Sequence, residues 1–138
     1  MAHELSTLTT GGKFFEGPRW HDGAWWVSDF YRHGVFTIAP DGTETQVLEV
    51  DTQPSGLGWL PDGRLLVVSM KDQRVLRQET DGTLVTHADL SGLITGMAND
   101  MVVDDNGRAW VGGFGFDLMG GETPVASPLI RVDPDGTL

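Results

Sequence analysis

One short turn signal recurs along the chain and sets a period. It is an Asp-Gly or Asn-Gly dipeptide between segments rich in β-branched and aromatic residues, and it occurs at Asp22-Gly23, Asp41-Gly42, Asp62-Gly63, Asp81-Gly82, Asn106-Gly107 and Asp135-Gly136. Such dipeptides favour tight hairpins, because they tolerate the positive φ angles that a type I′ turn requires at both central residues. Each occurrence therefore predicts a β-hairpin.

The spacing of these turns indicates a repeat of about 40 residues. From Gly23 to Gly63 is 40 residues and from Gly63 to Gly107 is 44, while the second turn of each unit follows the first by 19, 19 and 29 residues. A period in the 40s with two hairpins per unit is typical of four-stranded propeller blades. Helical repeats of that length would need apolar residues at helical spacing, which these short Gly-rich segments do not supply.

We therefore predict an all-β half-propeller. Its parts are an N-terminal closing strand within residues 1–13 and three blades of the four-stranded kind at residues 14–51, 52–91 and 92–138, the third lacking its outer strand. The predicted strands are 17–20, 24–28, 34–38 and 45–50, then 57–60, 65–69, 75–78 and 84–88, then 101–103, 109–112 and 129–132.

Three blades are too few to close a ring, because known rings take four to eight. Two copies that exchange the segment Leu5–Thr10 would leave no open sheet edge, and this predicts a two-fold homodimer with six blades. Two alternatives remain: a truncated chain whose missing half lies elsewhere, and an edge-to-edge filament.

The composition of the chain limits the classes of partner that it can bind and the compartment in which it is expected. The net charge of -11 argues against nucleic acid, whose phosphates the chain would repel. The absence of cysteine rules out disulfides and thiolate metal sites and favours a reducing compartment. Residues 1–13 lack the pattern of a signal peptide, and no apolar run reaches membrane-spanning length. We expect a cytoplasmic protein that acts on a small molecule rather than on nucleic acid or a membrane.

Four segments resemble the SMP-30/gluconolactonase family, whose members include the regucalcin-like lactonases. They read EGPRW at Glu16–Trp20, WWVSD at Trp25–Asp29, SGLGWLPDGRLLV at Ser55–Val67 and NDMVVDDNGRAWVGG at Asn99–Gly113. The resemblance covers the first half of a usual family member. It implies a six-bladed propeller that holds a divalent metal in its central tunnel and hydrolyses lactones or related esters.

The resemblance also implies a metal site, with Glu16 and Asn99 as ligands and calcium as the expected ion. The family's two further ligands, an asparagine and an aspartate, belong to a fourth and a fifth blade. In the predicted homodimer the partner's Glu16 and the partner's Ser55 would take those places. Calcium binds six to eight oxygen atoms, so water would complete the set.

Other candidates follow from their predicted position at the tunnel mouth, where the innermost strands begin and where the turns between second and third strands lie. We expect Asp100 and His33 as catalytic residues, because His33 is the one histidine in a mouth loop and Asp100 adjoins Asn99. The expected substrate-binding residues are Ser55, Asp29, Phe114 and Phe116.

Two functions from different classes remain open. One is a metal-dependent hydrolase of lactones or related esters, in which the ion polarises the carbonyl group. The other is a non-catalytic propeller that serves binding or assembly and has an altered metal site. An ion held by Glu16 and Asn99 would favour the hydrolase.

Overall fold

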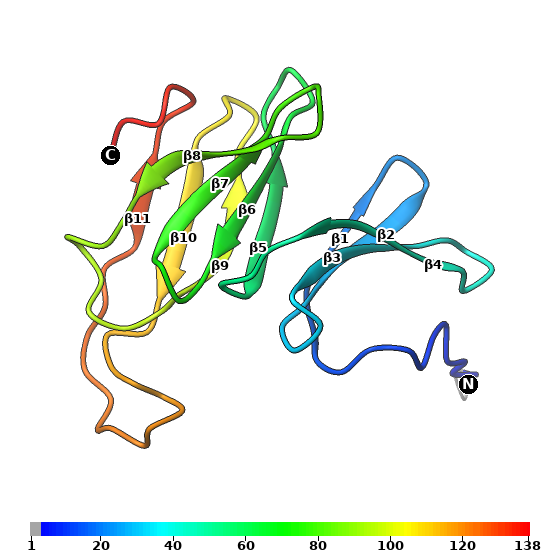
Figure 1. Cartoon of the computed structure of the whole chain (residues 1–138), viewed down its shortest axis with the longest axis horizontal. Helices are drawn as coiled ribbons and strands as arrows, with labels where there is room; N and C mark the ends of the chain where they lie inside the picture. The colour runs from blue at the N-terminus through cyan, green and yellow to red at the C-terminus, as the bar shows by residue number, and fades with distance from the viewer. Residues whose placement is uncertain (1–3) are drawn as a thin grey trace.

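The computed structural model describes residues 4–138 and contains three antiparallel sheets of consecutive strands (Figure 1). Sheet 1 comprises β1 (Phe15–His21), β2 (Ala24–Asp29), β3 (Gly34–Ile38) and β4 (Glu44–Glu49). Sheet 2 comprises β5 (Pro54–Trp59), β6 (Leu65–Ser69), β7 (Arg74–Gln78) and β8 (Leu84–Asp89). Sheet 3 comprises β9 (Ala98–Val103), β10 (Ala109–Gly113) and β11 (Ile130–Val132). The expectation of an all-β chain is confirmed. No helix long and apolar enough to cross a membrane occurs in the described part of the chain.

All eleven predicted strands are present, but the innermost strand of each sheet begins earlier than predicted. β5 starts at Pro54 rather than Leu57, and β9 starts at Ala98 rather than Met101. A register shift between Pro54 and Leu57 lets β5 continue past the point where its apolar alternation breaks. These early starts extend the innermost strands towards the end of the sheets where the candidate site lies.

The hairpin turns are of two kinds, which corrects the expectation of a single type I′ geometry. At the first turn both Asp22 and Gly23 have positive φ, as type I′ requires. At the later turns only the glycine has positive φ, as at Gly63, whose N–H donates to Leu60 O. At these turns the aspartate side chain accepts a hydrogen bond from the backbone N–H of the residue two positions later. For example, the Arg64 N–H donates to Asp62 Oδ1, and this bond stabilises a longer loop.

Apolar side chains fill the spaces between the sheets. Val35, Leu57 and Val67 lie in the cluster between sheets 1 and 2, and a larger cluster that includes Leu66 and Met101 joins sheets 2 and 3. The innermost strands approach so closely that a Cβ atom on Gly56 would lie 2.3 Å from the Met101 backbone nitrogen. Glycine at this position therefore permits β5 and β9 to pack side by side.

The N-terminal segment forms no strand between residues 4 and 13. Leu8 instead lines a groove on the outer face of sheet 1 together with Trp25 and Val27, while Leu5 is 93 % exposed. Residues 1–3 of the predicted closing strand lie outside the described residues. Exchange of this segment concerns two copies of the chain and remains a prediction.

Candidate functional site

The innermost strands bring three of the predicted residues together at one end of the sheets, which we call the mouth. Glu16 lies on β1, Ser55 on β5 and Asn99 on β9. Ser55 is buried, and its hydroxyl donates a hydrogen bond to Asn99 Oδ1 at 3.0 Å. Glu16 and Asn99 line a cavity of about 120 Å³ whose other walls are the apolar side chains Phe14, Phe30, Tyr31, Met70, Phe114, Leu118 and Met119. We call this space the small cavity.

The carboxylate of Glu16 is incompletely satisfied. Its Oε1 atom is buried and has no hydrogen-bond partner among residues 4–138. Burial is the main cause that raises the pKa of Glu16; the nearby Ser55 hydroxyl lowers it, and the negative charge of Asp100 raises it further. A buried carboxylate oxygen without a partner is costly unless something else pairs with it, and a cation would remove that cost.

The donor types at the small cavity suit a hard divalent cation. A carboxylate oxygen from Glu16 and an amide oxygen from Asn99 are ligands that calcium accepts. They are two donors, whereas calcium takes six to eight. No group of three His, Cys, Asp or Glu residues with metal-ligand geometry occurs within the described chain. The donors that one chain brings to the small cavity are therefore too few to complete a calcium coordination shell.

Asp100 lies beside the small cavity but is engaged elsewhere. Its Oδ1 accepts a hydrogen bond from Arg19 Nη2 at 2.8 Å, and the Arg19 guanidinium also donates to the Met101 carbonyl at 2.6 Å. The Asp100 side chain is 60 % exposed. The structure thus places this candidate catalytic residue in an ion pair at the rim.

Asp29 is fully buried, and both of its oxygens are occupied. Oδ2 accepts the Lys13 N–H at 2.8 Å and the Arg32 Nε–H at 2.7 Å, while Oδ1 accepts three backbone N–H groups at 3.2 Å, from Phe14, Tyr31 and Arg32. Burial acts to raise the pKa of Asp29, but these hydrogen bonds outweigh it and hold the pKa below its usual value. The structure therefore places Asp29 in a hydrogen-bond network behind Phe14 and Tyr31, and Asp29 itself does not line the small cavity.

His33 lies in the turn after β2 and lines neither cavity at the mouth. Its φ is 55°, and its Nδ1 is 2.7 Å from the Asp51 carbonyl oxygen. Gln73 occupies the equivalent turn of sheet 2 with the same φ, and its amide donates to the carbonyl oxygen of Ile94 at 3.1 Å. His33 and Gln73 thus tie equivalent turns to the chain that enters the next sheet.

The two phenylalanines of the long loop behave differently. Phe114 lines the small cavity and Phe116 does not, although the two rings are 6.2 Å apart in an edge-on arrangement. The loop that follows β10 lies at the same end of the sheets as the turn after β2 (Figure 1). This placement agrees with the prediction that both segments line the mouth.

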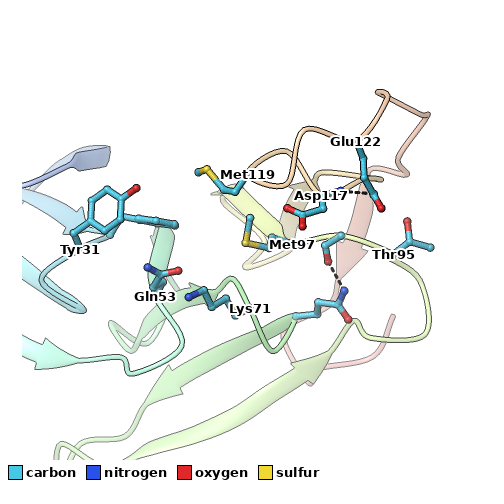
Figure 2. A pocket seen from close by; sticks show the side chains of 11 residues that line it. Tyr31, Gln53, Lys71, Thr95, Met97, Asp117, Met119 and Glu122 are labelled. Atoms are coloured by element: carbon cyan, nitrogen blue, oxygen red, sulfur yellow. Dashed lines mark hydrogen bonds between the residues drawn. The ribbon is translucent and has the colours of Figure 1, made fainter.

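A second cavity of about 620 Å³ opens at the mouth (Figure 2). It shares Phe30, Tyr31 and Met119 with the small cavity, and its polar residues include Gln53, Lys71, Thr95, Asp117 and Glu122. We call this space the large cavity. Lys71 lies in the turn between β6 and β7, and such turns were expected at the mouth, but neither Lys71 nor Gln53 was among the candidate residues.

A family model for the SMP-30/Gluconolactonase/LRE-like region matches residues 14–138. The chain belongs to this family. Among proteins with curated descriptions, none matches it in sequence.

Several solved structures share the fold of this chain. A gluconolactonase from Xanthomonas campestris has a TM-score of 0.74 and 24% identity over 94% of this chain and 47% of its own. The calcium-binding protein regucalcin from Agrobacterium tumefaciens has a TM-score of 0.61 and 23% identity over 83% of this chain and 39% of its own. A virginiamycin B lyase from Staphylococcus aureus has a TM-score of 0.57 and 14% identity over 93% of this chain and 45% of its own. This chain thus spans about half the length, or less, of these propeller-like relatives.

Proposed function

We propose that this family member provides half of a propeller that hydrolyses lactones or related esters with the help of a divalent cation, which we expect to be calcium. Family membership and the gluconolactonase among the structural relatives support the reaction class. The calcium-binding relative supports the cation. The observation that carries the proposal is the buried, unpartnered Oε1 of Glu16 beside the Asn99 amide in one cavity.

The residues of this chain would divide the work. Glu16 and Asn99 would hold the cation, and the Ser55 hydroxyl, through its 3.0 Å bond, fixes the orientation of the Asn99 amide. When bound, the cation polarises the ester carbonyl group. Water adds to the carbonyl carbon, the ring C–O bond breaks, and a hydroxy acid that loses its proton at neutral pH is formed. The apolar walls of the small cavity would surround the reacting group.

A non-catalytic binding propeller is the second candidate, and one observation favours it. The carboxylates of Asp29 and Asp100, which could have served as bases, are paired with Arg32 and Arg19 respectively.

Calcium titration tests the metal site directly. Glu16→Gln keeps the size of the side chain and removes the charge, whereas Glu49→Gln makes the same change at an exposed position at the end of β4. We expect calcium to raise the melting temperature of the wild type and of Glu49→Gln, and to have no effect on Glu16→Gln. A calcium response that survives Glu16→Gln would refute the role of Glu16.

Release of protons from a neutral lactone, followed with a pH indicator, then tests the reaction. Hydrolysis above the spontaneous rate that disappears in Glu16→Gln and with a chelator supports the hydrolase. A wild-type chain that binds calcium without hydrolysing any lactone supports the binding propeller instead.

We also propose that two copies complete six blades, because both outer faces of the chain carry exposed apolar side chains. Trp20 and Trp25 are 54 % and 40 % exposed on sheet 1, and Val102 is 57 % exposed on sheet 3. Light scattering should give a mass near twice 15.0 kDa. Val102→Asp should convert this species to a monomer, because it places a charge on the face that the partner would cover. A monomeric wild type would contradict the homodimer.

A further inference from the structure

The cationic side chains of this acidic protein are almost all neutralised. Each of the seven arginines lies within 4.0 Å of a carboxylate, and these arginines are Arg19, Arg32, Arg64, Arg74, Arg77, Arg108 and Arg131. The chain has nine lysines and arginines in total, so two lysines remain. One of them, Lys71, lines the large cavity, and no carboxylate within the described residues forms an ion pair with it.

The two acids of the large cavity are turned towards their own loop. Asp117 Oδ1 accepts the Gly120 N–H at 2.8 Å, and Glu122 Oε2 accepts the Asp117 N–H at 2.8 Å. Figure 2 shows Asp117 and Glu122 on one side of the cavity and Lys71 with Gln53 on the other. One oxygen of each carboxylate thus shapes the loop, and neither acid forms an ion pair with Lys71.

Gln53 adds a second, independent feature to the Lys71 side. It is 4 % exposed, yet its Oε1 atom has no hydrogen-bond partner among residues 4–138. Backbone hydrogen bonds from Lys71 N–H to Thr52 O, at 3.1 Å, and from Met70 N–H to Gln53 O, at 2.9 Å, hold the two segments together. The Gln53 Oε1 atom is thus a buried polar atom without a partner at this wall, and such atoms are costly in a folded chain.

We propose that Lys71 and Gln53 form a recognition subsite for an anionic, hydroxyl-bearing group, so that the preferred substrate is a lactone or ester that carries a carboxylate. This inference rests on the proposed hydrolase function. The ester group would lie in the small cavity at Glu16 and Asn99. The carboxylate would extend past Phe30, Tyr31 and Met119, which line both cavities, to Lys71 in the large cavity. The Gln53 amide would bond to a neighbouring hydroxyl group. The Lys71 ammonium, as a compact charge with three donors, would bind the carboxylate.

The subsite also serves specificity in a protein of net charge -11, whose overall field repels anions. An anionic ligand gains binding affinity in such a protein only beside a cation that no carboxylate neutralises, and Lys71 is such a cation among the described residues. An uncharged sugar lactone forms no ion pair with Lys71, and it therefore gives a matched comparison for the same cavity.

Two probes separate this subsite from the hydrolase function. D-glucarate is a polyhydroxy dicarboxylate that cannot be hydrolysed, and sorbitol is its neutral counterpart. By calorimetry, we expect wild-type protein to bind D-glucarate more tightly than sorbitol, and Lys71→Gln to weaken D-glucarate binding roughly tenfold, the loss expected for one charge-assisted hydrogen bond. Added salt should weaken the wild-type affinity and have less effect on the variant. Lys13→Gln is the control, because it removes the other unpaired lysine outside both cavities.

Kinetics extend the same comparison to D-glucaro-1,4-lactone, which carries a carboxylate, and D-glucono-1,5-lactone, which does not. Lys71→Gln should raise KM for the charged lactone roughly tenfold, leave its kcat unchanged and leave the neutral lactone unaffected. Equal D-glucarate binding by wild type and Lys71→Gln would overturn the subsite even if both lactones are hydrolysed. Lysine-dependent D-glucarate binding without any hydrolysis would support the subsite and refute the hydrolase.

Discussion

Glu16 and Asp29 lie on neighbouring paired positions of β1 and β2, yet their carboxylates are in opposite situations. Phe15 pairs with Asp29, and Glu16 pairs with Ser28. Asp29 accepts five hydrogen bonds, whereas Glu16 has a buried oxygen that accepts none among the described residues. Successive side chains of a strand point to opposite faces of the sheet. The one-residue offset between these two pairs therefore puts Asp29 and Glu16 on opposite faces, and only Glu16 keeps an oxygen without a hydrogen bond in the described chain.

This contrast distinguishes stability from function at the mouth. The Asp29 network joins the N-terminal segment, the turn after β2 and Arg32, which in turn binds Glu44 on β4 at 3.0 Å. The Arg32 guanidinium also lies 3.8 Å from the centre of the Phe36 ring. Glu16 instead lines the small cavity, where we propose that a cation binds. The two carboxylates should therefore respond in opposite ways to removal of their charge.

The largest effect is expected at Asp29. Asp29→Ala leaves the Arg32 charge and several backbone N–H groups without their partner, and we expect the free energy of unfolding to fall by about 3 to 5 kcal/mol. Urea unfolding followed by tryptophan fluorescence measures this loss. A loss below about 1 kcal/mol would mean that water replaces the carboxylate and that Asp29 is not the centre of the network.

The repeat was predictable from the sequence because hairpin turns leave a local signal. Asp-Gly and Asn-Gly dipeptides at a nearly regular spacing indicated all eleven strands and put Glu16 and Asn99 where innermost strands begin, while the family resemblance suggested their role. Local sequence determines these features because each depends on a few adjacent residues.

The partners of the side chains were not predictable in the same way. Asp29 and His33 were expected to serve the substrate, but their partners, Lys13 N–H and Asp51 O, come from segments that only the folded chain brings near. Lys71 was missed for a related reason. A free lysine is significant only when all seven arginines are seen to be paired. Six of them pair with a carboxylate within four residues, but the partner of Arg19, Asp100, lies far away in the sequence, and only the folded chain shows which acids line the cavity beside Lys71.

A smaller effect of opposite sign is expected at Glu16. Because burial raises its pKa, the folded chain binds the proton more tightly than the unfolded chain. The contribution of Glu16 to stability is therefore most favourable at low pH and is lost as the pH rises from about 4.5, the ordinary value, through the raised value. Without added metal, Glu16→Gln should be as stable as the wild type at pH 4 and up to about 1 kcal/mol more stable at pH 8. Urea unfolding at both pH values measures the difference. Destabilisation at pH 8 would show that Glu16, like Asp29, makes a structural contact.

The smallest effect is expected at the rim, where Arg19 and Asp100 form an ion pair with the geometry of the Arg32–Asp29 pair but with more exposure. The two ion pairs have similar distances, 2.8 Å and 2.7 Å, but the Asp100 side chain is 60 % exposed and that of Asp29 is 0 % exposed. Arg19→Gln should therefore cost about 1 kcal/mol or less in unfolding free energy, and 0.5 M salt should reduce this cost, since exposed pairs are screened.

The loss caused by Asp29→Ala should persist at the same salt concentration, because the buried pair is screened much less. Urea unfolding of both variants with and without salt makes the measurement. Equal salt sensitivity of the two losses would show that burial does not separate these pairs, and it would remove the basis for treating the Asp29 network as structural and the mouth as the part of the chain that binds.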